Sequence, residues 1–202
     1  MTDKKLLERF ECTQTLNSDF YLHNGLKGGK MGAIIFFFHC SRETGVDKYE
    51  EIAEHLLDDI YQNLSQNIPL DFVNGLSGIG WGIEYLLQHG FVEGEADEIL
   101  SEIDEYIIDE INRQHMAGLD LERGVVGLGR YILMRLRTSW RHGDTYASLA
   151  LKENLIYLID WIEKSLNAQN KPTNELVDLL QDIRETGFYK SKTEQIIQDF
   201  AL

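Results

Sequence analysis

The chain has 202 residues, enough to bury one substantial hydrophobic core or two small ones. It contains 34 acidic residues against 19 lysines and arginines, which gives a formal net charge of −15 at pH 7. Binding to nucleic acid or to anionic lipid depends on clustered lysine and arginine, so this charge argues against both as partners. The longest apolar run, residues 33–38, is also far too short to cross a bilayer.

The N-terminal residues and the cysteines bear on where in the cell the protein is located. The N-terminal residues lack the apolar core of a secretory signal. Cys12 and Cys40 are too few for a disulfide framework and lack the paired spacing of a zinc site. We therefore expect a cytoplasmic protein with free thiols, and we expect neither a metal nor another cofactor.

The first elements along the chain are a short amphipathic helix over residues 2–10 and a glycine-containing phrase at Asn24–Gly28. An apolar run over residues 31–38 and an amphipathic segment over residues 49–64 follow. The run Ile34–Phe38 is strand-like by propensity. We nevertheless predict a helix there, because helix-favouring residues occupy the same position in the later repeats.

The same order of phrase, apolar run and amphipathic segment recurs twice, at a spacing of about 50 residues, which indicates a repeat. Runs that are apolar all round are typical of helices buried on both flanks, and amphipathic segments are typical of helices with one buried stripe. The later copies comprise Asn74–Gly78, 79–87 and 96–111, and then Arg123–Gly127, 125–136 and 151–166.

These alternating segments predict an all-α fold, an array of α/α hairpins with apolar inner helices and amphipathic outer ones. The glycines permit tight turns where the inner helices begin. Residues 173–201 lack the phrase and, with residues 2–10, are expected to form capping helices. Residues 1–202 would then be a single repeat domain. Its hairpins are expected at roughly 20–66, 70–115 and 120–168.

The phrases at Gly75–Gly82 and Gly124–Gly129, and more loosely Gly25–Gly32, resemble those of the lanthionine synthetase C-like family when combined with this hairpin repeat. The resemblance covers roughly residues 20–168. It implies part of a double-ring (α/α) toroid. The enzymes of that family add cysteine thiols to dehydrated serine or threonine in a precursor peptide.

The chain departs from those enzymes at their zinc site. The resemblance implies two cysteines and a histidine as zinc ligands, with a Cys-His-Gly phrase, and a further histidine for acid/base chemistry. Here Thr13 follows Cys12, Ser41 follows Cys40, and the sequence contains no Cys-His-Gly. A complete toroid also has more hairpins than the three expected here. The resemblance therefore implies the fold without the cyclase activity.

Three residues are candidates for a catalytic role. His23 precedes the first phrase, where it could act in acid/base chemistry or bond to the backbone of a turn. Asp71 and Glu84 are the type of carboxylate pair that toroidal glycoside hydrolases use. A salt bridge to Arg130 or Arg135 would explain Glu84 equally well, because an acid inside an apolar run is costly unless it has a partner.

A binding cleft is expected where the inner helices begin. Their free N–H groups and helix dipoles favour an anion or a peptide carboxylate. Ordinary capping and packing would account for the same residues. The lining would include His23, Asn24, Lys27, Asn74, Ser77, Trp81 and Arg123.

A docking patch is a second candidate surface, because arginine and tryptophan are favoured at interface centres. Pairing of these arginines with the acidic outer helices is the alternative. The patch would comprise Arg130, Arg135, Arg137, Trp140 and Arg141.

We therefore expect a non-catalytic lanthionine synthetase C-like protein that binds a peptide or a partner enzyme, accessory to peptide modification. The alternatives are a degenerate toroid enzyme, a peptide cyclase or hydrolase with a cleft at the inner-helix N-termini, and a purely structural interaction domain. Because three hairpins do not close a ring, the open side is expected to be sealed by end helices or buried in a homodimer.

Overall fold

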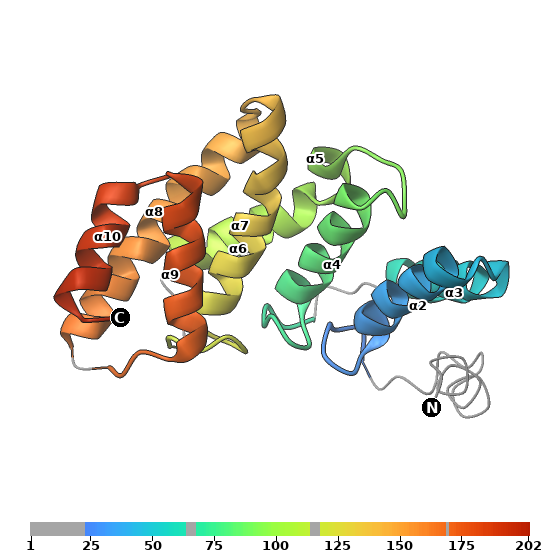
Figure 1. Cartoon of the computed structure of the whole chain (residues 1–202), viewed down its shortest axis with the longest axis horizontal. Helices are drawn as coiled ribbons and strands as arrows, with labels where there is room; N and C mark the ends of the chain where they lie inside the picture. The colour runs from blue at the N-terminus through green and yellow to red at the C-terminus, as the bar shows by residue number, and fades with distance from the viewer. Residues whose placement is uncertain (1–22, 64–67, 114–117, 169) are drawn as a thin grey trace. The chain divides into compact units, whose positions relative to one another are not determined.

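A computed structural model describes residues 23–63, 68–113, 118–168 and 170–202. Within these ranges every regular element is an α-helix, which confirms the all-α prediction (Figure 1). The chain divides into two compact units, Met1–Asn67 and Ile68–Leu202, which are described here one at a time. The single domain over the whole chain stays a prediction.

The first unit contains one helical hairpin, formed by α2 (Lys30–Thr44) and α3 (Asp47–Gln62). Gly45 ends α2 in the left-handed conformation, which glycine adopts at little cost, and so allows the sharp turn into α3. An ion pair between Lys30 and Asp59 joins the start of α2 to the end of α3. The apolar run that is strand-like by propensity is helical, as predicted. The buried side chains between the two helices include Met31, Ile34, Phe38, Ala53, Leu56 and Ile60.

The second unit contains the remaining helices, packed as hairpins. Inner helix α4 packs against α7, α7 packs against α8 and α9, and outer helix α6 packs against α8. The outer segment predicted over 96–111 is interrupted at Leu100, where α5 ends and α6 begins. The helices are α4 (Leu76–Gln88), α5 (Ala96–Ile99), α6 (Ser101–Asn112), α7 (Val125–His142), α8 (Tyr146–Asn167), α9 (Asn174–Thr186) and α10 (Lys190–Asp199).

The segment predicted as a C-terminal cap is a further hairpin of the array. Helix α9 packs against α7, and a Cβ on Gly129 of α7 would lie 2.7 Å from Leu179 Cδ2, so a larger residue there would require Leu179 to shift. Helix α10 lies beside α8, to which the ion pair between Lys192 and Glu163 joins it. The predicted N-terminal capping helix, residues 2–10, lies outside the described residues.

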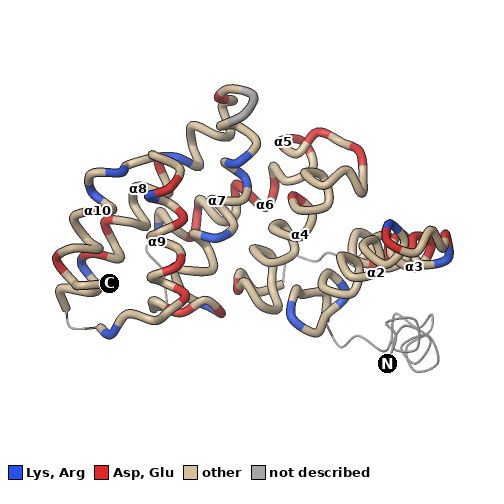
Figure 2. The backbone as a smooth tube through the Cα atoms, in the orientation of Figure 1, with Lys and Arg blue, Asp and Glu red and all other residues tan. Residues whose placement is uncertain are grey.

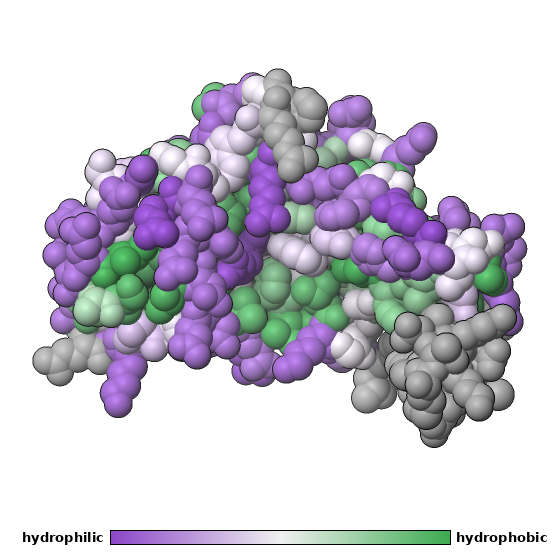
Figure 3. Space-filling model, viewed as in Figure 1, coloured by the Kyte–Doolittle hydropathy of each residue, from purple (hydrophilic) through white to green (hydrophobic). Residues whose placement is uncertain are grey.

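The core of the second unit lies between its inner and outer helices. Tyr131, Ile132 and Leu136 of α7 are fully buried there against residues of α6, α8, α9 and α10. Acidic residues lie along α3, α5 and α6 (Figure 2). Hydrophilic side chains cover much of the surface over α9 and α10 in the view of Figure 3, with apolar ones showing between them.

Each inner helix that follows a glycine phrase begins with the same loop. The first N–H of the helix donates to a carbonyl seven residues earlier, in the pairs Lys30 to His23 (3.1 Å), Leu76 to Pro69 (2.8 Å) and Val125 to Gly118 (2.9 Å). The residue before each of these helices is Gly29, Gly75 or Gly124. A Cβ at any of the three would collide with backbone atoms of its loop, so the close approach requires glycine.

This geometry corrects the register of the first repeat. The predicted phrase Asn24–Gly28 lies in the loop, and the residues equivalent to Gly75–Gly78 are Gly29–Gly32. Gly32 approaches the carbonyl of Leu26 as Gly127 approaches that of Leu121. The sequence was ambiguous here because glycines are unusually dense, and only the hydrogen bonds show which of them precedes the helix.

Candidate functional site

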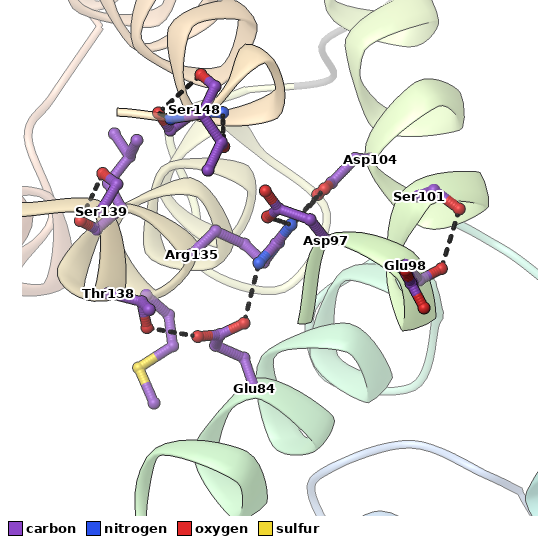
Figure 4. Close-up of polar contacts among 12 residues, drawn as sticks. Glu84, Asp97, Glu98, Ser101, Asp104, Arg135, Thr138, Ser139 and Ser148 are labelled. Atoms are coloured by element: carbon purple, nitrogen blue, oxygen red, sulfur yellow. Dashed lines mark hydrogen bonds and ion pairs between the residues drawn. The ribbon is translucent and has the colours of Figure 1, made fainter. Parts of the chain in front are cut away.

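Glu84 is buried in the middle of α4, with 1% of its surface exposed. Its Oε2 pairs with Nη1 of Arg135 on α7 at 2.9 Å, as the sequence alternative of a salt bridge to Arg135 predicted (Figure 4). Its Oε1 accepts hydrogen bonds from Gln88 Nε2 (2.8 Å) and Thr138 Oγ1 (2.9 Å). Both carboxylate oxygens are therefore engaged by neighbouring side chains.

The same guanidinium binds two further carboxylates. Arg135 Nη2 lies 2.7 Å from Asp104 Oδ2 of α6 and 2.9 Å from Asp97 Oδ1 of α5. The hydroxyl of Tyr131 donates to Asp104 Oδ1 at 2.5 Å. We call this group the Arg135 cluster, and it comprises Glu84, Asp97, Asp104, Tyr131 and Arg135.

The electrostatics of the Arg135 cluster explain how it tolerates burial. Burial disfavours the charged guanidinium, but the hydrogen bond and charge of Asp104 outweigh it and raise the pKa of Arg135 above its ordinary value. Burial, followed by the charge of Asp104, raises the pKa of Tyr131 well above 10. A permanently charged arginine therefore joins α4, α5, α6 and α7, and Glu84 serves as one of its anchors.

Asp71 and His23 are each bonded within the loops that precede inner helices. Asp71 Oδ1 accepts the backbone N–H of Asn74 at 2.5 Å, and Asp120 accepts that of Arg123 at 2.7 Å in the next repeat. The recurrence indicates a role for Asp71 in shaping the loop. His23 Nδ1 accepts the N–H of Gly25 at 3.1 Å, the arrangement of a histidine that bonds to its own turn.

The predicted binding cleft draws on both units. His23, Asn24 and Lys27 belong to the first unit and the other residues to the second, so the cleft as a whole stays a prediction. Within the second unit, Ser77 and Arg123 line a hollow of about 40 Å³, which is room for about one water molecule.

The remaining polar and aromatic groups at this end of the second unit are engaged in local packing. Ser77 Oγ donates to the carbonyl of Leu70 at 2.6 Å. Trp81 stacks on Tyr85, with ring centroids 5.4 Å apart, and meets Phe72 edge-on. These contacts hold the start of α4 in place and leave little room for a ligand beside it.

The residues of the predicted docking patch do not all lie at the surface. Arg135 is 3% exposed and belongs to the Arg135 cluster, so it is not part of a surface. Arg130 pairs with Asp182 of α9. Arg137 is exposed and Trp140 is half-buried against the core of the second unit, whereas the side chain of Arg141 lies outside the described residues. Pairing with acidic residues accounts for two of the four described members.

The two cysteines bear on the expectation that the chain holds no metal, which stays a prediction. Cys40 is buried in α2, and burial raises the pKa of its thiol, whereas a zinc ligand is a thiolate. In the part of the chain that the structure describes, no three histidine, cysteine or acidic residues gather as metal ligands would. Cys12 lies outside that part. In the same part, no helix has both the length and the apolar character needed to cross a membrane.

The second unit also has a groove along α8 that sequence reasoning missed. A hollow of about 720 Å³ runs along one face of α8, past the end of α6. A second hollow, of about 430 Å³, shares three of its lining residues and extends to the loops before α7 and α9. We call the two together the α8 groove. Its lining includes Tyr157, Asp160, Trp161, Lys164, Ser165 and Asn170.

Except for Asn170, which lies in the loop after α8, these residues belong in the sequence to an ordinary amphipathic helix. Tyr157 and Trp161, one turn apart at the border of the buried stripe, were the available signal. The neighbouring loops that turn this face into a groove could not be placed from the sequence.

A family assignment agrees with the helical array and its glycine loops. The sequence profile of the family described as "Lanthionine synthetase C-like protein" matches residues 21–188, which is most of the chain. No curated protein matches it significantly. The family has an (α/α) toroid fold. The chain therefore belongs to the lanthionine synthetase C-like family.

Proposed function

We propose that this chain is a non-catalytic member of its family that binds a peptide or a partner enzyme, as an accessory to peptide modification. The observation that carries the proposal is the engagement of the catalytic candidates in structural contacts. Glu84 anchors the buried Arg135, Asp71 holds its loop, and His23 bonds to its own turn. Of the three, Asp71 lines only the hollow of about 40 Å³, which has room for about one water molecule and not for a peptide substrate.

Binding, by contrast, requires only a suitable surface, and the α8 groove has the volume typical of ligand sites. The net charge of −15 argues for a neutral or basic partner and against nucleic acid or membrane. The proposal includes a cytoplasmic location. It also keeps a second copy of the chain as a candidate partner.

The test measures binding and turnover on the same full-length protein. The immobilised chain is exposed to a pool of random peptides, and retained peptides are identified by mass spectrometry. The free chain is then incubated, with and without added zinc, with a peptide that contains dehydroalanine and cysteine, and free thiol is titrated over time. We expect retained peptides and no loss of thiol beyond that in a control without the protein.

Thiol loss that depends on the protein would contradict the proposal and favour the degenerate enzyme. In that case Glu84→Gln, Asp71→Asn and His23→Gln would show which side chain takes part. A native mass spectrum of the full chain adds the number of subunits and any tightly bound metal. A stoichiometric zinc would also favour the enzyme.

A further inference from the structure

We propose that Asn24–Gly25 is a site of self-modification, at which the chain converts Asn24 to aspartate or isoaspartate with His23 as the base. The reaction needs no ligand and is independent of the proposed function. Asparagine is chemically labile where glycine follows it, because the next backbone nitrogen can attack the side-chain amide without hindrance from a Cβ. The sequence contains two such pairs, Asn24–Gly25 and Asn74–Gly75.

His23 contacts the nitrogen that attacks in this reaction. The N–H of Gly25 donates to Nδ1 of His23 at 3.1 Å, within the reach of a general base. The imidazole lies close against the loop, since a Cβ on Gly29 would be only 2.6 Å from the same Nδ1. Water also has access to the loop, because Asn24 is half-buried and Lys27 is exposed. A base, a nucleophile and water therefore meet at this pair.

The reaction balances with water as its only co-reactant. The Gly25 N–H gives its proton to His23 Nδ1 while the nitrogen forms a bond to Cγ of Asn24, which closes a cyclic imide, the succinimide. The imidazole returns that proton to the side-chain nitrogen of Asn24, whose bond to Cγ breaks, and ammonia leaves. Water then opens the succinimide. It gives aspartate when the new bond to Cγ breaks and isoaspartate when the original peptide bond breaks.

The second pair is arranged differently. The N–H of Gly75 donates to the carbonyl oxygen of Asp71 at 3.0 Å, and Asp71 Oδ1 accepts the N–H of Asn74 at 2.5 Å. A carbonyl oxygen accepts a hydrogen bond but is far too weak a base to take the proton. Counted back from the inner helix, Gly25 occupies the position of Asp71, so the first loop lacks this carboxylate. Asn74 is therefore a matched control within the same chain.

The product alters the loop where it joins α2. The carbonyl of Asn24 accepts the N–H of Met31 at 3.3 Å, beside the bond from Lys30 to the carbonyl of His23. In isoaspartate the main chain passes through Cγ and gains one carbon, and the former carbonyl of residue 24 becomes a free carboxylate. The modification thus adds a negative charge and lengthens the backbone at the start of the first hairpin.

The test follows both asparagines in one sample of the full chain. The protein is incubated at neutral pH for several weeks, and its peptides are analysed by mass spectrometry with a fragmentation method that distinguishes aspartate from isoaspartate. We expect Asn24 to convert at least about tenfold faster than Asn74. In a parallel sample unfolded in urea, where the contacts of both loops are lost, the two rates should become similar.

A variant examines the base directly. His23→Ala removes the imidazole and keeps the Asn24–Gly25 pair, so we expect Asn24 to convert about tenfold more slowly while Asn74 is unaffected. His55→Ala, which removes an exposed histidine of α3, should leave both rates unchanged. If H23A proves to be misfolded by circular dichroism, the comparison of Asn24 with Asn74 in the wild type decides the matter.

Two results would overturn the proposal. Equal rates at Asn24 and Asn74 in the folded wild type would mean that the first loop does not promote the reaction. A folded H23A that converts Asn24 as fast as the wild type would mean that His23 is not the base. Either result leaves the proposed function standing, because peptide or partner binding does not depend on this reaction.

Discussion

The guanidinium of Arg135 lies between the buried carboxylates of Glu84 and Asp104, so its removal leaves both acids without their cation. A buried charge that loses its partner costs far more than the pair contributes while intact. We expect Arg135→Ala to lower the free energy of unfolding by about 3–5 kcal/mol in urea titrations.

Arg137 offers a matched control for this variant, two residues along the same helix and exposed. Arg137→Ala should change the free energy of unfolding by less than about 0.5 kcal/mol. Equal effects of the two variants would mean that the Arg135 cluster does not hold the helices together.

The hydroxyl of Tyr131 gives the cluster a dependence on alkaline pH. Its pKa is raised in the folded protein, whereas an unfolded tyrosine titrates at about 10. Above about pH 10 the unfolded chain therefore releases this proton first, and the free energy of unfolding falls as the pH rises further. Tyr131→Phe should reduce that fall, which urea midpoints at about pH 8 and about pH 11 would measure for both proteins.

Tyr131→Phe also loses the hydrogen bond to Asp104, so it starts about 1 kcal/mol less stable at about pH 8. The stability gap between the two proteins should narrow at about pH 11 as the wild type loses stability. A gap that is constant or wider at high pH would show that Tyr131 titrates normally.

At the level of elements, the position before an inner helix requires glycine, because the backbone of the preceding loop lies too close for a side chain. A Cβ on Gly124 would lie 2.5 Å from the carbonyl oxygen of Gly118 and 2.7 Å from the backbone of Asp120. We expect Gly124→Ala to lower the free energy of unfolding by about 3 kcal/mol, the upper end of overpacking costs, because backbone must move.

A substitution at Gly187 serves as a control, because it changes the cost of backbone conformation without a steric clash. It has a positive φ of 78°, and no neighbouring atom lies within 4 Å of the place that an alanine methyl group would occupy. Gly187→Ala should therefore cost only about 1 kcal/mol. Thermal or urea unfolding of the two variants, side by side, gives the comparison. An equal or smaller effect at Gly124 would rule out the tight loop.

The existence and type of the helices could be predicted from periodicity, because a stripe of buried side chains repeats along each of them. Their finer features could not. The break at Leu100 within the second outer segment and the register shift to Gly29–Gly32 both depend on local hydrogen bonds. The spacing of apolar residues along the chain indicates neither the break nor the shift.

For the whole molecule, the second unit has a core made entirely from its own helices. Among the residues that the structure describes, the buried cluster extends from Leu100 to Ile196 and includes none from the first unit. We expect residues 68–202, expressed alone, to be helical by circular dichroism and to unfold in a single urea transition. A fragment that gains its helicity only when residues 1–67 are present would contradict this independence.

By itself the sequence determined the helical class, the alternation of inner and outer helices and the family resemblance, because these follow from periodicity and from glycine spacing along the chain. Tertiary structure decided which charges meet. It buried Arg135, which the sequence had placed in a docking patch, and it fixed the partner of Glu84 among two candidates. It also formed the α8 groove from α6, α8 and two loops. Such convergence depends on how helices pack in three dimensions, and residue spacing within one segment does not encode it.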